Sequence, residues 1–219
     1  MNLTSPVQDI SPLYPESDGK PMAETDVHRQ LLSDLVFTLE TFFQKQPDVY
    51  VSGNLLIYYV EGNPKKRIAP DVFVARGIKK RRRRIYKLWE EGVAPQVVIE
   101  LTSRQTWRED LQEKWRLYEQ LGVEEYFIFD PEYDYLDDPL VGYRLKDGKY
   151  KIMNARDRRL RSKVLGLELV DTGETLRLFD PGSGRFLPNM EESANAQQRL
   201  SELESELARH RERFGVIEK

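Results

Sequence analysis

Three charged residues occupy positions in or beside apolar segments. Glu100 lies within the apolar run VVIEL, and Asp71 directly precedes the apolar run VFVA. Lys114 belongs to a helical pattern and lies on the apolar side of that helix. Burial of a charge is costly unless the charge has a partner, so residues of this kind are candidates for a functional site.

The helix that carries Lys114 is predicted over residues 105–121. At about 100° per residue, its apolar side chains fall on one arc, and the charged residues inside that arc are Asp110 and Lys114. They are four positions apart, so they can form an ion pair on one face of the helix. The alternative is a lysine whose stem packs on the core while its ammonium reaches solvent. Glu100, in its apolar strand, favours the functional interpretation.

The chemistry that these residue types support is hydrolysis of a phosphodiester. Two carboxylates from neighbouring strands can hold one Mg²⁺ or Mn²⁺ ion, which keeps its other positions for water and phosphate. A nearby lysine can orient or deprotonate the attacking water and stabilise charge on the phosphate. We therefore predict Asp71 and Glu100 as metal ligands and Lys114 as their catalytic partner.

The composition agrees with such a site and excludes several others. The chain has no cysteine, which rules out disulfides, thiolate zinc sites and cysteine nucleophiles. Its two histidines, His28 and His210, nearly exclude a histidine-based metal site. No signal peptide and no run of about 20 apolar residues is recognisable, so we expect a soluble, cytoplasmic protein with no membrane partner.

A run of six basic residues lies between the two strands that supply the carboxylates. The net charge of −3 argues against a broad surface that coats nucleic acid, but this run is a local exception. Six adjacent cations can guide a polyanion toward two acids, although a solvated loop remains the alternative. The expected contacts to the DNA backbone are Lys79, Lys80, Arg81, Arg82, Arg83 and Arg84.

The elements around the site predict an α/β or α+β fold, with a β-sheet flanked by helices. Residues 1–22 are read as an extended lead-in, residues 23–180 as the main domain, and residues 181–219 as a linker and a C-terminal helix. A helix is expected over residues 24–45. Two adjacent β-rich runs, 49–52 and 55–60, suggest a hairpin. Further strands are expected over 67–75, 96–102, 126–129, 142–145, 149–153, 164–170 and 175–179.

The C-terminal helix, predicted over residues 190–213, has an apolar seam about three heptads long. The seam follows 4-3-4-3-4 spacing and consists of Ala196, Leu200, Leu203, Leu207, His210 and Phe214. This length is near the lower limit for a coiled coil that would make a homodimer. Packing of the helix onto its own domain is the alternative, and the sequence does not decide between them.

Four segments together resemble a known family. The segments PDVFVA, VVIELTS, D-x-x-x-K-x-x-x-Y and GVEEYFIFDP occur in that order. Over roughly residues 24–180 the chain is similar to the Uma-type restriction endonucleases of the PD-(D/E)XK superfamily. The resemblance implies a restriction-endonuclease-like core with a mixed sheet, DNA as substrate, and Mg²⁺ or Mn²⁺ as cofactor. It also implies Asp71 and Glu100 as ligands and Lys114 as the catalytic lysine.

Further residues come from the same resemblance. Asp110 and Tyr118 are similar to the helix motif that contains the lysine, and Glu24 and His28 match the first helix loosely. Thr102 stands where the superfamily usually has its lysine, two residues after the strand glutamate. The lysine role would thus belong to Lys114 on the following helix, as in the Uma-type pattern.

Two other functions compete with a nuclease. One is a catalytically silent protein on the same fold that binds nucleic acid or a protein partner. The other is an assembly role for the C-terminal helix, with the sheet as a scaffold. A nuclease requires that the carboxyl groups of Asp71 and Glu100 lie close enough to share one ion.

Overall fold

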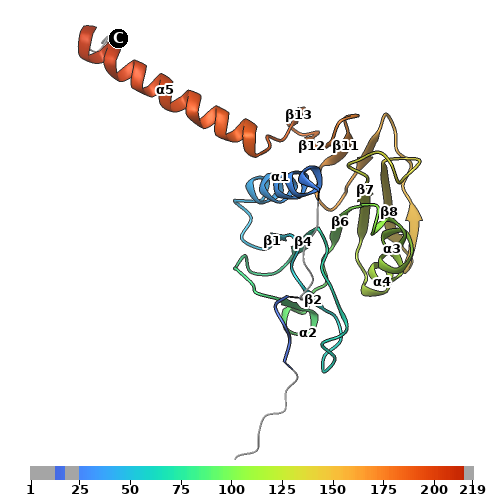
Figure 1. The fold of residues 1–219 in the computed structure, drawn as a ribbon. Coiled ribbons are helices and arrows are strands. Elements are labelled where there is room, and N and C mark those ends of the chain that lie inside the picture. The colour runs from blue at the N-terminus through green and yellow to red at the C-terminus, as the bar shows by residue number, and fades with distance from the viewer. Residues whose placement is uncertain (1–12, 18–24, 215–219) are drawn as a thin grey trace, which may run out of the picture.

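The computed structural model describes residues 13–17 and 25–214, and its centre is a six-stranded mixed sheet (Figure 1). Neighbouring strands are antiparallel except for the third and fourth, which are parallel. In spatial order the strands are β1 (Val49–Ser52), β4 (Val72–Arg76), β6 (Val97–Leu101), β7 (Glu125–Phe129), β8 (Leu140–Lys146) and β9 (Lys149–Ile152).

One face of this sheet is covered by helix α1 (Asp26–Phe42) and by a second, four-stranded sheet. The Thr25 side chain caps α1 by accepting a hydrogen bond from the backbone N–H of His28. Leu31, Leu35 and Leu39 recur at the helical period and are buried against the sheet. The second sheet contains β10 (Arg159–Arg161), β11 (Glu168–Asp171), β12 (Leu176–Asp180) and β13 (Arg185–Phe186).

The opposite face packs against an interrupted helix and a small sheet. The helix begins as α3 (Trp107–Glu109), passes through a π-helical segment, η1 (Asp110–Lys114), and continues as α4 (Trp115–Leu121). Gly122 ends it in the left-handed conformation, with φ 79°. The small sheet and the helix beside it comprise β3 (Arg67–Ile68), β2 (Ile57–Tyr58), β5 (Tyr86–Lys87) and α2 (Leu88–Glu91).

The fold class expected from the sequence is confirmed, and two local expectations are wrong. β1 and β2 do not form a hairpin, because β1 pairs with β4 whereas β2 pairs with β3 and β5. The turn at Gly53 and Asn54 instead lies against the start of β4, where the N–H of Asn54 donates to the carbonyl of Pro70. The expected linker also contains a strand, β13, paired with β12.

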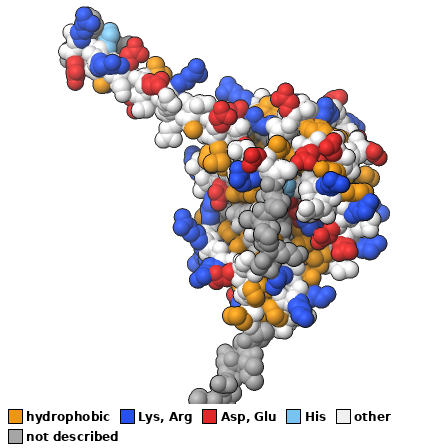
Figure 2. Space-filling view, viewed as in Figure 1, with side chains coloured by type: hydrophobic (Ala, Val, Ile, Leu, Met, Phe, Trp, Pro, Cys, Tyr) orange, Lys and Arg blue, Asp and Glu red, His pale blue; other side chains and the backbone are white. Residues whose placement is uncertain are grey.

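The last element, α5 (Met190–Phe214), extends away from the two sheets (Figure 1). Its surface carries basic and acidic side chains along its whole visible length (Figure 2). None of the helices in the described part of the chain is both long and apolar enough to cross a membrane.

Candidate active site

The pairing of β4 with β6 brings the two candidate metal ligands together. Val72 lies opposite Ile99, so one further step along the antiparallel register places Asp71 opposite Glu100. The backbone N–H of Asp71 donates to Oε2 of Glu100 at 3.3 Å. The N–H of Leu101 donates to Oδ2 of Asp71 at 2.8 Å, which fixes that carboxylate at the end of the two strands.

Strand alternation decides which face of the sheet receives Glu100. Val97, Ile99 and Leu101 point into the core beneath α1, whereas Val98 points to the opposite core. Glu100 follows Val98 at a spacing of two and therefore points toward η1 and α4. A charged residue in an otherwise apolar strand is thus directed at the helix that carries Lys114.

Lys114 meets this carboxylate inside the protein. Its Nζ lies 3.0 Å from Oε2 of Glu100 and 2.8 Å from Oδ1 of Asp110. The side chain of Lys114 is 13% exposed, while those of Glu100 and Asp110 are 0% and 1% exposed. The alternative in which the ammonium reaches solvent does not describe this lysine, and the predicted pair with Asp110 is present.

Two tyrosines hold this cluster in place. The hydroxyl of Tyr118, one turn beyond Lys114, donates to Oε1 of Glu100 at 2.6 Å. The hydroxyl of Tyr126 on β7 donates to the backbone carbonyl of Asp110 at 2.9 Å, at the first residue of the π-helical segment. Irregular helical turns leave carbonyls that need partners, and Tyr126 supplies one. Neither the π-helical segment nor the contact of Tyr126 was predicted from the sequence.

The charges of the cluster shift one another's pKa values. Burial raises the pKa of Glu100 to about 8, against the opposing effect of Lys114, and the charges of Asp71 and Asp110 add to the rise. Burial also acts to lower the pKa of Lys114, but the surrounding carboxylates outweigh it and raise that pKa, so Lys114 is an ammonium. For Asp71, burial is outweighed by His28 and Lys114, and the pKa is lowered.

The remaining candidate residues are His28, Thr102 and Glu24, and they differ in their relation to Asp71 and Glu100. His28 Nε2 is 2.9 Å from the carbonyl oxygen of Leu101 and 3.6 Å from Oδ2 of Asp71, so α1 brings a histidine to the site. Thr102 is buried, and no described residue hydrogen-bonds its Oγ1, so it does not contribute the charge that a lysine would. Glu24 lies outside the described residues.

The basic run does not behave as one uniform patch. Arg83 is tied into the protein, because its guanidinium bonds both oxygens of Glu91 at 2.8 Å and stacks 4.2 Å from the ring centre of Tyr50. With a side chain that is 1% exposed, Arg83 is a structural residue, and the expectation that it contacts DNA is corrected.

The rest of the run remains exposed. Exposed members with a partner include Lys80, which donates to a backbone carbonyl at 3.2 Å, Arg81, which pairs with Glu91 at 2.8 Å, and Arg84, which pairs with Glu16. Lys79 and Arg82 are also exposed and form no ion pair with another described residue. Lys79 and Arg82 are therefore the members of the run whose charged groups are most accessible to a ligand.

A groove of about 620 Å³ lies beside this run. Its lining includes Lys80, Arg81 and Arg82 together with Ser52 and Gly53. A Cβ on Gly53 would lie 2.5 Å from the carbonyl oxygen of Asp71, so only glycine allows the turn to lie so close to the candidate ligand. This close approach was not predicted from the sequence.

The donor set suits a hard divalent cation with few protein ligands. The two carboxylates come from paired positions on neighbouring strands, and Asp71 accepts the hydrogen bond of Leu101 through Oδ2. No group of three or more acidic, histidine or cysteine side chains among the described residues could hold a metal. An ion at Asp71 and Glu100 would therefore take most of its ligands from water and substrate, as Mg²⁺ commonly does.

Comparison with known proteins identifies the family of this chain. A family model named Uma2, described as "Putative restriction endonuclease", matches residues 14–172, which is more than half of the chain. The chain belongs to the Uma2 family. The matched segment contains Asp71, Glu100 and Lys114 and ends before α5, so the family resemblance inferred from the sequence motifs is confirmed.

A solved structure supports the same fold for this Uma2-family chain. A crystal structure from Anabaena variabilis, described as a putative nuclease belonging to DUF820, is 16% identical with a TM-score of 0.50. The match covers 67% of this chain and 76% of that one. No curated protein matches the chain.

Proposed function

We propose that this chain is a metal-dependent endonuclease that hydrolyses phosphodiester bonds of DNA. Membership of the Uma2 family supports a nuclease function. The observation that carries the finer proposal is the convergence of Asp71 and Lys114 on Glu100, where β4 begins and β6 ends. Two carboxylates and one ammonium match what phosphodiester hydrolysis requires.

Each residue of the cluster has a distinct role in the proposal. Asp71 and Glu100 hold Mg²⁺ or Mn²⁺, which when bound acts as a Lewis acid and lowers the pKa of coordinated water. Because Lys114 is an ammonium, it orients the attacking water and stabilises the negative charge of the phosphate rather than removing a proton. Asp110 and Tyr118 are positioning residues, since they hold Lys114 and Glu100.

The test is nicking of supercoiled plasmid in Mg²⁺ or Mn²⁺, compared with EDTA, by wild type and Glu100→Gln. The substitution removes charge and little volume, so metal-dependent nicking should disappear while the folded circular dichroism spectrum remains. Glu109→Gln, at an exposed position in the same helical region, is the matched control and should cleave as wild type does. Equal cleavage by wild type and Glu100→Gln would reject the assignment.

DNA binding is proposed for the exposed part of the basic run, namely Lys79, Lys80, Arg81, Arg82 and Arg84. Replacing Lys79 and Arg82 with glutamine should weaken binding and reduce the slope of log affinity against log salt by about 1.8, or about 0.9 for each phosphate contact. Fluorescence anisotropy of a labelled duplex measures this slope.

A matched control removes two charges elsewhere. Lys146→Gln with Lys151→Gln changes the net charge equally at exposed positions on β8 and β9, away from the basic run. This double variant should keep the wild-type slope. If both double variants have the same slope, the basic run acts only through the net charge and the proposed contacts are wrong.

A silent nuclease-fold protein that binds nucleic acid or a partner is the second candidate. The observation that favours it is the closed cluster in which Lys114 already contacts both Glu100 and Asp110 without any metal. Titration calorimetry with Mn²⁺ separates the two candidates. Binding that is lost in Glu100→Gln favours the nuclease, and no binding together with no cleavage favours the silent protein.

A further inference from the structure

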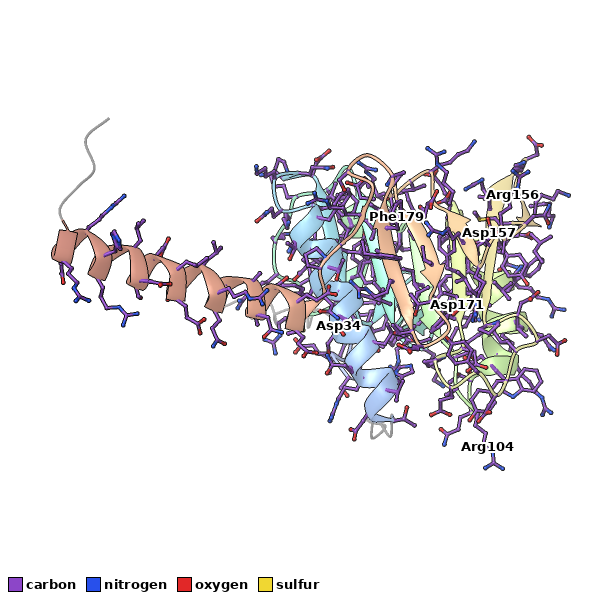
Figure 3. All side chains as sticks on the ribbon, turned by 90° about the horizontal axis from the view of Figure 1, so that it is seen from above. Asp34, Arg104, Arg156, Asp157, Asp171 and Phe179 are labelled. Carbon is purple, nitrogen blue, oxygen red and sulfur yellow. The ribbon has the colours of Figure 1, made fainter. Side chains whose placement is uncertain are left out.

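Among the described residues, helix α5 contacts the body through its first residues. The N–H of Met190 donates to Oδ1 of Asp34 at 3.2 Å, and Glu192 pairs with Arg177 at 2.7 Å. Figure 3 shows the helix leaving the body close to Asp34. Every side chain from Ala194 to Arg213 is exposed. Because a helix in water draws most of its stability from packing of an apolar face, a helix this exposed is incomplete by itself.

The exposed helix does carry an apolar face. Leu200, Leu203 and Leu207 are 61%, 60% and 50% exposed, which places three large apolar side chains in water. Their spacing of three and four residues puts them on one stripe. In heptad notation, Leu200 and Leu207 take position a, while Ala196 and Leu203 take position d. This is the seam of a coiled coil, about three heptads long and lying outside the matched family segment.

The charges that flank the seam point to a specific partner. Position g contains Arg199 and Glu206, and position e contains Glu204 and Arg211. In a parallel, in-register pair, each g residue faces the e residue of the next heptad of the partner helix. Arg199 then faces Glu204, and Glu206 faces Arg211, so the helix complements the charges of its own copy at both places.

An antiparallel pair is less favourable. The antiparallel register that sets Leu200 against Leu203 also brings Glu204 opposite Glu204 of the other helix, and like charges in these flanking positions oppose pairing. The register that sets Leu203 against Leu207 pairs Arg199 with Glu206, but it places Leu200 against His210 instead of another leucine. The parallel arrangement is the one that combines leucine layers at 200, 203 and 207 with complementary charges.

We propose that α5 pairs with α5 of a second copy of this chain in a parallel, in-register, two-stranded coiled coil. The leucine stripe forms the seam, and Arg199–Glu204 and Glu206–Arg211 form between the two chains. Both bodies then lie at the same end of the coil, since each joins α5 through the short segment 187–189.

Sedimentation velocity of the full chain over a wide range of protein concentration tests the proposal. Wild type should reach twice its mass of 25.8 kDa at high concentration. Leu203→Glu places a charge in the seam and should remain a monomer. Ser205→Glu, at the exposed f position opposite the seam, is the matched control and should still dimerise.

A charge exchange tests the register. Arg199→Glu or Glu204→Arg alone creates two like-charge pairs per dimer, and each should weaken dimerisation by about tenfold. An equimolar mixture of the two variants should regain wild-type affinity, because every facing pair in the heterodimer is again opposite in sign.

Four results would overturn the proposal. They are a wild-type monomer at all concentrations, a dimer that survives Leu203→Glu, a larger oligomer, and a mixture that fails to recover. Rescue by the pair Arg199→Glu and Glu206→Arg, in place of Arg199→Glu and Glu204→Arg, would indicate the antiparallel orientation and would also reject the parallel coil.

Discussion

Replacing Lys114 with methionine should destabilise the protein by an amount that depends on pH. Methionine keeps the length of the stem and removes the ammonium that lies 3.0 Å from Glu100 and 2.8 Å from Asp110. Both carboxyl groups are almost completely buried, so each is left in a poorly solvated place. Removing one partner of a buried ion pair typically costs about 3–5 kcal/mol.

Protonation limits this cost at low pH, because a carboxyl can replace its lost partner with a proton. In wild type, the pKa of Glu100 is already raised to about 8, so below pH 8 this carboxyl is protonated in both folded proteins. Loss of the ammonium raises its pKa further in the variant, so above pH 8 the folded variant keeps a proton that folded wild type releases. The difference in stability between the two proteins then grows by about 1.4 kcal/mol per pH unit, or about 2.7 kcal/mol between pH 8 and pH 10.

The assay is urea unfolding of wild type and Lys114→Met at pH 7 and pH 10, followed by circular dichroism. The difference in unfolding free energy should be small at pH 7 and approach about 3–5 kcal/mol at pH 10. Lys149→Met removes an exposed lysine from a surface pair and should change neither value appreciably. A difference that is the same at both pH values would refute the inference that Lys114 compensates buried carboxylates.

Three further predictions follow from individual contacts. Because burial raises the pKa of Glu100 to about 8, an entering metal displaces a proton, so the rise in Tm produced by Mn²⁺ should grow from pH 6.5 to pH 8.5. A flat profile would contradict this. Gly53→Ala places a Cβ 2.5 Å from the carbonyl of Asp71 and should reduce plasmid nicking more than it reduces Tm. Arg83→Gln removes the bidentate partner of a largely buried carboxylate and should cost about 1.5–3 kcal/mol in urea unfolding. An unchanged unfolding free energy would contradict the structural role of Arg83.

The sequence predicted the elements whose pattern is local. Strand β6 and the following helix were recognisable from apolar runs and helical periodicity, and both are present. The pairing of β1 was not predictable in this way, because strand partners are chosen by packing over long sequence separations. The turn at Gly53 was read as a hairpin signal, whereas its actual neighbour is Asp71, distant in sequence.

The candidate site was predictable to a similar degree. Charges in apolar segments identified Glu100 and Lys114 without any knowledge of their contacts, since burial of a charge is readable from pattern. A sequence pattern does not show which cation of a basic run forms an ion pair inside the protein. Arg83 was therefore expected to contact DNA, although it pairs with Glu91. The helical segment around Asp110 was expected to be regular, and the contact from Tyr126 that accompanies its π-helical turn comes from a different strand.

Because Lys114 lies on a helix and not on the strand of Glu100, it has a second acidic partner, Asp110. A lysine at position 102 would lie on the same face as Glu100, with no acidic neighbour on its own element other than Glu100 itself. Lys114 instead arrives together with Asp110, which contacts its ammonium at 2.8 Å. If a metal bound to Glu100 as proposed, the carboxylate of Asp110 would still compensate the ammonium, and Lys114 would not have to leave its buried place. The acid of the helix motif would thus keep the lysine charged and in position both before and after a cation entered.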